Sequence, residues 1–489
     1  MQGEKYYSEK LFTSFQLSAR VPQDNFYRRL RDVLDLRWLR HKTRKYYGTE
    51  GQQSIDPIVF FKMILIGYLE NLGSDRRIVE TVRLRMDLLY FIGYDIDEEV
   101  PWHSTLSRTR QLFGQEVFKE LFRKVLSKCI EKGMVAGCRQ AIDSVHLKAN
   151  ASLSSIKRKE VLKDGELYAV SLQAEEHNEG EDDNWSNATH QSSTDPDARL
   201  ATKPGKSTGF KYLGQVSVDT AHHVITEVQM HHADKRDSQC LEEMVEGVLE
   251  NLQGEGLMVE ELLADSAYSS TDSLQCLENN GLTGYIPNHG RYKTEREGFN
   301  YDKDNDCYVC SQGVQLNYTG TGLDKEGQPR KEYHSSAKDC KGCPLRHKCL
   351  GKATYKRIRE LVNKHLFDDM HKRMQTKHGR SMMKLRQSTV EPVLGTLVNH
   401  RGIRRINTRR IQQADKCLLM AAVAYNLKKM LGFKAPKVKV MAKIREKAEN
   451  LAQTCSIILL TTYEAIRNTL LELFGITDNK KLISQFAWQ

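Results

Sequence analysis

Apolar residues follow one spacing in the first part of the chain and another spacing after it. Over residues 24–135, apolar positions recur at helical intervals. One such stretch, "DPIVFFKMILIGYLENL", begins with an aspartate suited to an N-cap, and another, "QEVFKELFRKVLSKCIEKG", ends at a glycine suited to a C-cap. From about residue 137 the apolar runs become short and β-like. The pattern predicts an all-helical N-terminal domain over residues 1–135 and an α/β region beyond it.

The α/β region is predicted from strands that alternate with helices. The run "RQAIDSVHL" is typical of a strand, and residues 210–220 and 223–232 are typical of a hairpin. An amphipathic helix, "SQCLEEMVEGVLENLQ", separates this hairpin from two further strands, in "MVEELLADSAY" and "GLTGYIPN". This order predicts a mixed sheet flanked by helices.

The remaining boundaries follow from changes in composition. The first part of the core covers residues 136–289, and an acidic loop over 172–200, with 8 acids against 1 base, interrupts it. Residues 290–350 are rich in Gly, Lys, Asp and Cys, with little periodicity, and are predicted to be a small insertion. Helical spacing returns over 351–432, the second part of the core, and an apolar helical tail is predicted over 433–489.

The overall composition is that of a soluble globular protein, with 39% hydrophobic and 28% charged residues. No stretch approaches the 18 or so apolar residues of a membrane-spanning helix, and Lys62 interrupts the nearest one. The N-terminus, "MQGEKYYSEK", lacks the apolar segment of a secretory signal. We therefore expect a cytoplasmic protein with no membrane partner.

Positive charge is concentrated near the end of the predicted core. Residues 351–430 contain 19 lysines and arginines against 5 acids, an excess of +14, whereas the whole chain carries +11. A basic surface of this kind is typical of a protein that binds a polyanion such as DNA. A solvated helix face remains an alternative explanation.

A second candidate for phosphate contact lies in the helical domain, in "VPWHSTLSRTRQLFG". Ser104 or Thr105 stands at a predicted helix start, and Arg108 and Arg110 follow within the next two turns. Helix N-termini with hydroxyl and guanidinium side chains suit phosphate groups. An ordinary N-cap on a surface helix is the alternative.

Two aspartates at predicted strand ends are candidates for chemistry. Asp143 follows "RQAI" and Asp265 follows "ELLA". In an open α/β sheet, reactive groups gather beyond the strand ends. If the two strands are neighbours, the two carboxylates can share a hard cation such as Mg²⁺, which prefers oxygen ligands and serves phosphoryl transfer.

Glu391, in "RQSTVEPVLGTLVNHRGIRRINTRR", is the candidate third carboxylate. Pro392 favours a helix start at this position, with Ser388 or Thr389 as caps. Neutralisation of nearby arginines is the alternative role for Glu391. The arginines that follow it are candidate contacts to DNA phosphates: Arg401, Arg404, Arg405 and Arg409.

Four motifs, in this order along the chain, resemble the DDE transposases of bacterial insertion sequences: "IDSVHLKANAS", "GFKYLGQVSVD", "LLADSAYSS" and "VEPVLGTLVNHRGIRRI", the last followed by "AYNLKKM". The resemblance covers about residues 25–432 and is to the branch with an RNase H-like core and a helical N-terminal domain. It implies that Asp143, Asp265 and Glu391 form a catalytic triad that holds Mg²⁺ or Mn²⁺. In such cores the first aspartate lies on strand one, the second on the adjacent fourth strand, and the glutamate on a later helix.

One departure from the family pattern concerns the segment after the glutamate. The family usually has a lysine or arginine shortly before the "nRG" element, where this chain has Val398 and Asn399. The cation that would hold the transposon end is therefore open among Arg401, Arg404 and Arg405.

The resemblance also implies partners and a location. A transposase of this type would bind double-stranded DNA, both terminal inverted repeats and target DNA, and would work as a homodimer or larger oligomer. It would be cytoplasmic in a bacterium and associated with the nucleoid when bound to DNA. Two alternatives are a transposase-derived DNA-binding protein without catalysis and an RNase H-like nuclease that cuts DNA without joining it.

Five of the eleven cysteines cluster in the predicted insertion, within "CYVC" (307–310) and "CKGCPLRHKC" (340–349). Paired C-x₂-C motifs are typical of a structural zinc site, and zinc would stabilise a segment too small for its own core. By spacing alone, either Cys307 or Cys349 is surplus. The family resemblance favours Cys310, Cys340, Cys343 and Cys349 as ligands, with Cys307 as the alternative. Reduced thiols without metal are the competing explanation.

Overall fold

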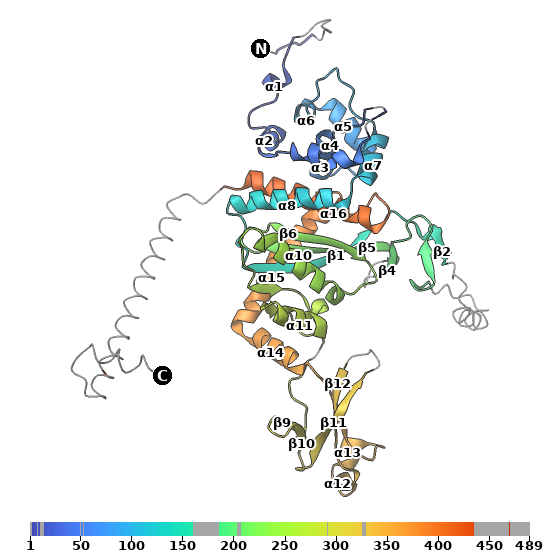
Figure 1. Ribbon diagram of the computed structural model, residues 1–489, viewed down its shortest axis with the longest axis vertical. Coiled ribbons are helices and arrows are strands. Elements are labelled where there is room, and N and C mark those ends of the chain that lie inside the picture. Colours follow the sequence, from blue (N-terminus) through green and yellow to red (C-terminus); the bar gives the residue numbers. More distant parts are fainter. Residues whose placement is uncertain are drawn as a thin grey trace. The chain divides into compact units, whose positions relative to one another are not determined.

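The computed structural model describes residues 2–434 except 7, 10–13, 49, 52, 160–184, 203–206, 291 and 325–328, and also describes residue 469 (Figure 1). The chain divides into two units, Met1–Gly432 and Phe433–Gln489. The predicted helical tail over 433–489 and most of the predicted acidic loop lie outside the described residues. Among the described helices, none is long and apolar enough to cross a membrane.

The N-terminal part of the first unit is helical, as its apolar spacing predicts. Asp56 begins the central helix by accepting a hydrogen bond from the Ile58 N–H, and Pro57 occupies the first turn. That helix is buried along almost its whole length. The helices of this region are α1 (Leu17–Arg20), α2 (Phe26–Val33), α3 (Trp38–Thr43), η1 (Arg44–Tyr46), α4 (Pro57–Leu69), α5 (Asp75–Leu84), α6 (Met86–Ile92), α7 (His103–Leu112) and α8 (Gln115–Glu131).

A six-stranded mixed sheet forms the core of the α/β region. Its strands are β1 (Arg139–Lys148), β4 (Arg199–Ala201), β5 (Gly209–Asp219), β6 (Ile225–His232), β7 (Glu261–Leu263) and β8 (Thr283–Tyr285). β5 runs antiparallel to β1, β6 and β4, whereas β7 runs parallel to β1 and β8 runs parallel to β7. When the three-residue β4 is left aside, β7 is the fourth strand along the chain and lies next to the first. The sheet therefore has the RNase H-like arrangement that the sequence predicts.

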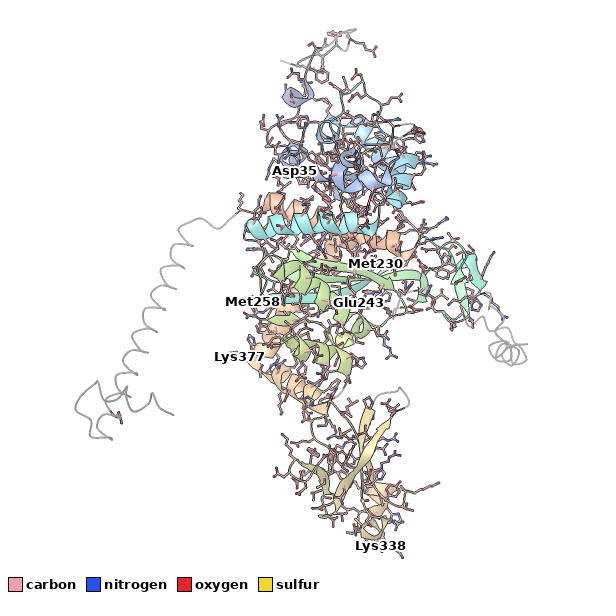
Figure 2. All side chains as sticks on the ribbon, viewed as in Figure 1. Asp35, Met230, Glu243, Met258, Lys338 and Lys377 are labelled. Carbon is pink, nitrogen blue, oxygen red and sulfur yellow. The ribbon has the colours of Figure 1, made fainter. Side chains whose placement is uncertain are left out.

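Helices cover this sheet and connect it to the helical domain (Figure 1). α10 (Leu241–Gln253) packs against β6, where Figure 2 labels Glu243 on the helix and Met230 on the strand. α15 (Lys377–His400) packs against β1 and β5. α16 (Ile411–Gly432) contacts β6, α8 and α4, so it joins the sheet to the N-terminal helices. The other helical segments are η2 (Leu153–Ser155), η3 (Asp237–Gln239), η4 (Ser266–Tyr268), α11 (Thr271–Asn279) and α14 (Lys364–Gln375).

The predicted insertion is a small β-structure with its own core. Five antiparallel strands form one sheet: β9 (Phe299–Asp302), β10 (Cys307–Cys310), β11 (Gln315–Leu323), β12 (Pro329–His334) and β13 (Arg357–Leu361). Tyr308, Leu316, Tyr333 and Ile358 are buried together on it. Two short helices, α12 (Ala337–Lys341) and α13 (Arg346–Leu350), complete the segment. Because β13 pairs with β12, the segment extends beyond the predicted boundary at residue 350, and helix resumes only at Lys364.

A further difference concerns the region before β5. The predicted acidic loop over 172–200 contains β3 (His190–Ser192), which pairs with β2 (Ile156–Arg158), and the start of β4. These strands are only three residues long. Such short runs show too little alternation to be distinguished from a polar loop by pattern alone.

Candidate active site

The register of the central strands brings the two predicted aspartates together. β1 and β7 are parallel, and their last pair is Ala141 with Leu263. Asp143 and Asp265 each lie two residues beyond that pair, Asp143 still on β1 and Asp265 just after the end of β7. Asp143 was predicted at a strand end, but it lies within β1. The reason is that β1 continues to pair with β5 after β7 has ended. Asp265 leaves the sheet and caps η4 by accepting a hydrogen bond from the Ala267 N–H (2.9 Å).

One guanidinium group bridges the two carboxylates. Arg386 on α15 places Nη2 2.8 Å from Asp143 Oδ2 and 3.7 Å from Asp265 Oδ2. The Arg386 side chain is 8% exposed and that of Asp143 15%, so this contact is largely removed from water, whereas Asp265 is 41% exposed. The two carboxylates therefore converge on a single cationic position that solvent reaches from the Asp265 side.

Arg386 is not among the residues predicted from the sequence. The feature that could have identified Arg386 is its position on the buried face of α15. The buried residues at helical spacing around it are Met382, Thr389, Val390 and Val393. A lone arginine on such a buried helix face requires an acidic partner, because an unpaired buried charge is costly. The sheet supplies that partner through Asp143.

Burial raises the pKa of Asp143 to about 6, and the negative charges of Asp265 and Asp237 act in the same direction. The Arg386 guanidinium and the hydrogen bond from the Ser144 N–H oppose this rise. The effect of burial thus outweighs that of Arg386 on the pKa of Asp143. Two convergent oxygen donors of this kind fit a hard divalent cation.

Glu391 lies on a different side of α15 from Arg386. The prediction that Glu391 and Pro392 begin a helix is wrong, because α15 begins at Lys377 and Pro392 lies inside it. At about 100° per residue, Glu391 is about 140° around the helix from Arg386, and it is exposed. In the described part of the chain, no group of three or more His, Cys, Asp or Glu side chains is arranged to hold a metal ion. The acids that the structure brings together are therefore Asp143 and Asp265.

The predicted DNA-contacting arginines fall into two sets. Arg401 is 4% exposed and donates to the carbonyl oxygens of Leu69 and His400. Arg110 is 7% exposed and forms a two-bond ion pair with Asp75 (2.6 and 3.0 Å). These two guanidinium groups are engaged inside the protein. The exposed members are Arg108, Arg404, Arg405 and Arg409.

Ser104 and Thr105 lie in the first turn of α7, which begins at His103 with Trp102 at the N-cap. The predicted helix start is therefore confirmed to within two residues. Both side chains are half-buried, and no side chain caps this helix end.

The cysteines of the insertion do not form a metal centre among the described residues. Cys307, the alternative ligand, is 1% exposed on β10. Cys310, Cys340, Cys343 and Cys349 are half-buried, and Cys340 Sγ lies 3.2 Å from Ser335 Oγ. The zinc prediction rests on the paired C-x₂-C motifs, and the segment also has an aromatic core around Tyr308 and Tyr333 that does not depend on a metal.

Two family profiles match the chain. Residues 15–112 match the family described as "Transposase domain (DUF772)", and residues 309–431 match the family described as "Transposase DDE domain". The first match covers most of the helical domain. The second includes Arg386, Glu391 and the arginine-rich segment after them. A search of curated proteins finds no match.

Three solved structures illustrate the similarity at the level of coordinates. A Mos1 transposase paired-end complex with left transposon end is 11% identical, with a TM-score of 0.16, and covers 50% of this chain and 64% of that chain. A Mos1 mariner paired end complex with Mn is 12% identical, with a TM-score of 0.16 and the same coverage. A piggyBac transposase synaptic complex with hairpin DNA is 12% identical, with a TM-score of 0.23, and covers 84% and 81%. This chain thus spans less than two thirds of the Mos1 chains, and the fold assignment rests on its own strand order.

Proposed function

We propose that this chain, which matches two transposase family profiles over residues 15–112 and 309–431, is a DDE-type transposase of an insertion sequence. In this proposal it cleaves DNA at the ends of such an element and joins those ends to target DNA. The substrates in this proposal are terminal inverted repeats and target duplexes. Joining two ends requires two active sites in one complex, so the proposed working form is a homodimer or a larger oligomer.

The observation that carries the proposal is the convergence of Asp143 and Asp265 on one cation, Arg386. In the active complex, the same two carboxylates would hold Mg²⁺ or Mn²⁺. Such a cation supplies activation of the attacking oxygen and stabilisation of the leaving oxygen in phosphoryl transfer. Zinc has no part in this proposal, because the described cysteines are not gathered around a common position.

Each of the chain's own residues has a separate task. Asp143, with a pKa of about 6, is ionised at neutral pH and available as a ligand. Arg386 offsets one of the two negative charges of the acid pair when no other cation is present, which limits repulsion between the two carboxylates. The exposed arginines Arg404, Arg405 and Arg409, together with Arg108, are proposed to contact DNA phosphates.

Glu391 is proposed as the third carboxylate, and its position requires a change in α15. Pro392, the residue after Glu391, lacks an N–H. The carbonyl oxygen of Ser388 therefore receives no helical hydrogen bond from it. The helix lacks one backbone hydrogen bond at this point, and local unwinding there would turn Glu391 toward the acid pair.

Substitution of Asp143 by Asn tests the proposal. Cleavage of a terminal-repeat duplex should fall by at least about a thousandfold, while binding to that duplex should be kept, because only a ligand atom and its charge are removed. The matched control is Asp369→Asn, an exposed acid on α14 that should leave cleavage unchanged. Cleavage at the normal rate by Asp143→Asn would overturn the catalytic assignment.

A second assay separates the proposed function from its alternatives. Pre-cleaved ends with a free 3′-hydroxyl should be joined to a plasmid by the unmodified chain. A nuclease that only cuts would leave them unjoined, and a DNA-binding protein without catalysis would neither cut nor join.

A further inference from the structure

The arginine-rich loop over residues 401–410 is held in place by both domains of the first unit. On one side, the Gly402 N–H donates to Asn71 Oδ1 (2.8 Å) at the end of α4. On the other side, the Ile406 N–H donates to the carbonyl oxygen of Lys148 at the end of β1 (2.8 Å). Asn150 Nδ2 donates to the Asn407 carbonyl (3.1 Å). These bonds use backbone atoms of the loop, and its exposed side chains include Arg404 and Arg409.

Two buried or half-buried acids fix the far end of the loop. Asp195 Oδ1 accepts the Arg410 N–H (2.8 Å), and Asp197 Oδ2 accepts the Ile411 N–H (3.0 Å) at the start of α16. Asp195 is fully buried and also accepts the Tyr212 hydroxyl (2.8 Å). Asp195 and Asp197 thus accept hydrogen bonds from backbone N–H groups at the N-terminus of α16. They are separate from the acid pair of Asp143 and Asp265. They also hold Arg410 in a left-handed conformation (φ 69°).

A polar cavity of about 880 Å³ opens between this loop end, α7 and the segment before β4. Its lining includes the guanidinium-bearing Arg409 and Arg410, together with the neutral donors Ser107, Asn150, Ser193 and Thr194. Asp75 and Arg110 also line it, but their charges cancel in an ion pair. Within the described residues, neither the Arg409 nor the Arg410 side chain has a hydrogen-bond or ion-pair partner.

We infer that this cavity binds backbone phosphates of the DNA substrate. Paired guanidinium groups surrounded by hydroxyl and amide donors are the side chains that contact DNA phosphates and sugars. The inference rests on the proposed function, and it adds a binding position for the substrate at a defined distance from the acid pair.

That distance follows from the length of β1. Lys148, which holds the loop, lies five residues along the strand from Asp143, and Asn150, which lines the cavity, lies seven residues from it. At about 3.3 Å per residue, these separations are about 17 and 23 Å. One DNA strand advances about 3.4 Å per nucleotide. For a DNA strand that lies along β1, the contacted phosphates should be about five to seven nucleotides from the cleaved bond.

Neutral phosphate analogues test the position, in combination with the double variant Arg409→Ala, Arg410→Ala. In the unmodified full chain, a methylphosphonate about five to seven nucleotides from the cleavage site should weaken binding of the terminal-repeat duplex by about tenfold. In the double variant, the same analogue should have no further effect, because its protein partner has been removed. The variant should also lower the slope of log K against log salt concentration by about one to two.

Two matched variants complete the test. Lys303→Ala with Lys352→Ala removes the same charge from exposed positions in the insertion and should leave the methylphosphonate effect intact. Arg409→Lys with Arg410→Lys keeps the charge and should restore most of the salt dependence. Unmodified chain that fails to bind terminal-repeat DNA would refute the proposed function. Normal binding, with a methylphosphonate effect that persists in the alanine variant, would refute the phosphate cavity alone.

Discussion

Two pairs of neighbouring acids in the described part of the first unit, Asp143 with Asp265 and Glu227 with Asp415, differ in the groups that bind them. Burial raises the pKa of Asp143 to about 6, and it raises the pKa of Glu227 on β6 to about 7 and that of Asp415 on α16 to about 6. By their pKa values alone, all three acids are candidates for function. Their bonding partners separate them.

Neutral amides serve the second pair. Asn251 on α10 donates to Glu227, while the Met230 N–H and Gln115 on α8 donate to Asp415 (Met230 N–H to Oδ1, 2.9 Å). These bonds connect α8, α10, α16 and β6 and leave little capacity for a ligand. Asp143 and Asp265 instead share one guanidinium group, and Asp265 is open to solvent. A raised pKa therefore reflects burial, whereas the proposed site is distinguished by two acids that converge on one cationic group.

The largest stability effect expected from this comparison concerns Arg386. In the absence of metal, Arg386→Gln should destabilise the protein by about 3 kcal/mol, because it leaves Asp143 buried beside a second carboxylate without a cation. Millimolar Mn²⁺ should recover much of this loss, since a cation that binds only the folded chain stabilises it by mass action. Thermal unfolding with and without MnCl₂ measures both effects. A variant as stable as the parent, or one indifferent to Mn²⁺, would contradict the shared cation position.

How much of this site can be predicted from the sequence depends on how far apart along the chain the interacting residues lie. Asp143 and Asp265 could be identified because strand patterns are local and the family motifs surround each residue. Arg386 could not, because its partners lie on strands more than 100 residues earlier in the chain, and only the folded sheet brings them beside α15. The start of α15 was misplaced because Pro392 resembles a first-turn proline, whereas packing against β1 and β5 carries the helix through it.

A similar limit applies to the insertion. Its strands alternate aromatic with charged and polar residues, as in "FNYDKDNDCYVC", and contain few aliphatic residues. The five-stranded sheet and the core of Tyr308, Leu316, Tyr333 and Ile358 were therefore not predicted. The spacing of the cysteines led to the prediction of a zinc site instead. Spacing along the chain does not establish that four thiols converge in space.

The pH dependence of stability should distinguish the acids bound by amides, Glu227 and Asp415, from the pair of Asp143 and Asp265. The expected effect is smaller than that of Arg386→Gln. The pKa of Glu227 is about 7 in the folded protein against an ordinary value of 4.5, so the folded state binds the proton more tightly. The free energy of unfolding should therefore fall as pH rises from about 4.5 to about 7, by about 2 kcal/mol from this group. Glu227→Gln should remove that part of the slope, because the amide keeps an oxygen acceptor for Asn251 and does not ionise.

The control for that measurement is Glu246→Gln, an exposed acid on α10 that should leave the pH profile unchanged. Urea unfolding at several pH values gives the profile. DNA cleavage by Glu227→Gln, measured at pH 8, should stay within about twofold of the parent, because Glu227 is bound by Asn251 and does not contact the acid pair. A large loss of cleavage would mean that the second pair of acids takes part in the reaction.

The smallest effect on the free energy of unfolding is expected for the cysteines of the insertion. Like the acids, these thiols can act as metal ligands only where several of them converge on one position. Cys343→Ser should change the free energy of unfolding by no more than about 0.5 kcal/mol, because Cys343 is half-buried and the described residues place no set of three donors around it. Tyr333→Ala, by contrast, should cost about 3 kcal/mol, because Tyr333 is 2% exposed and packs against Tyr308 in the core of the insertion. Unfolding of the full chain with and without a zinc chelator measures the difference. If the chelator and Cys343→Ser each destabilised the insertion as strongly as Tyr333→Ala, the four cysteines would hold zinc, and the aromatic core would be insufficient to fold this segment.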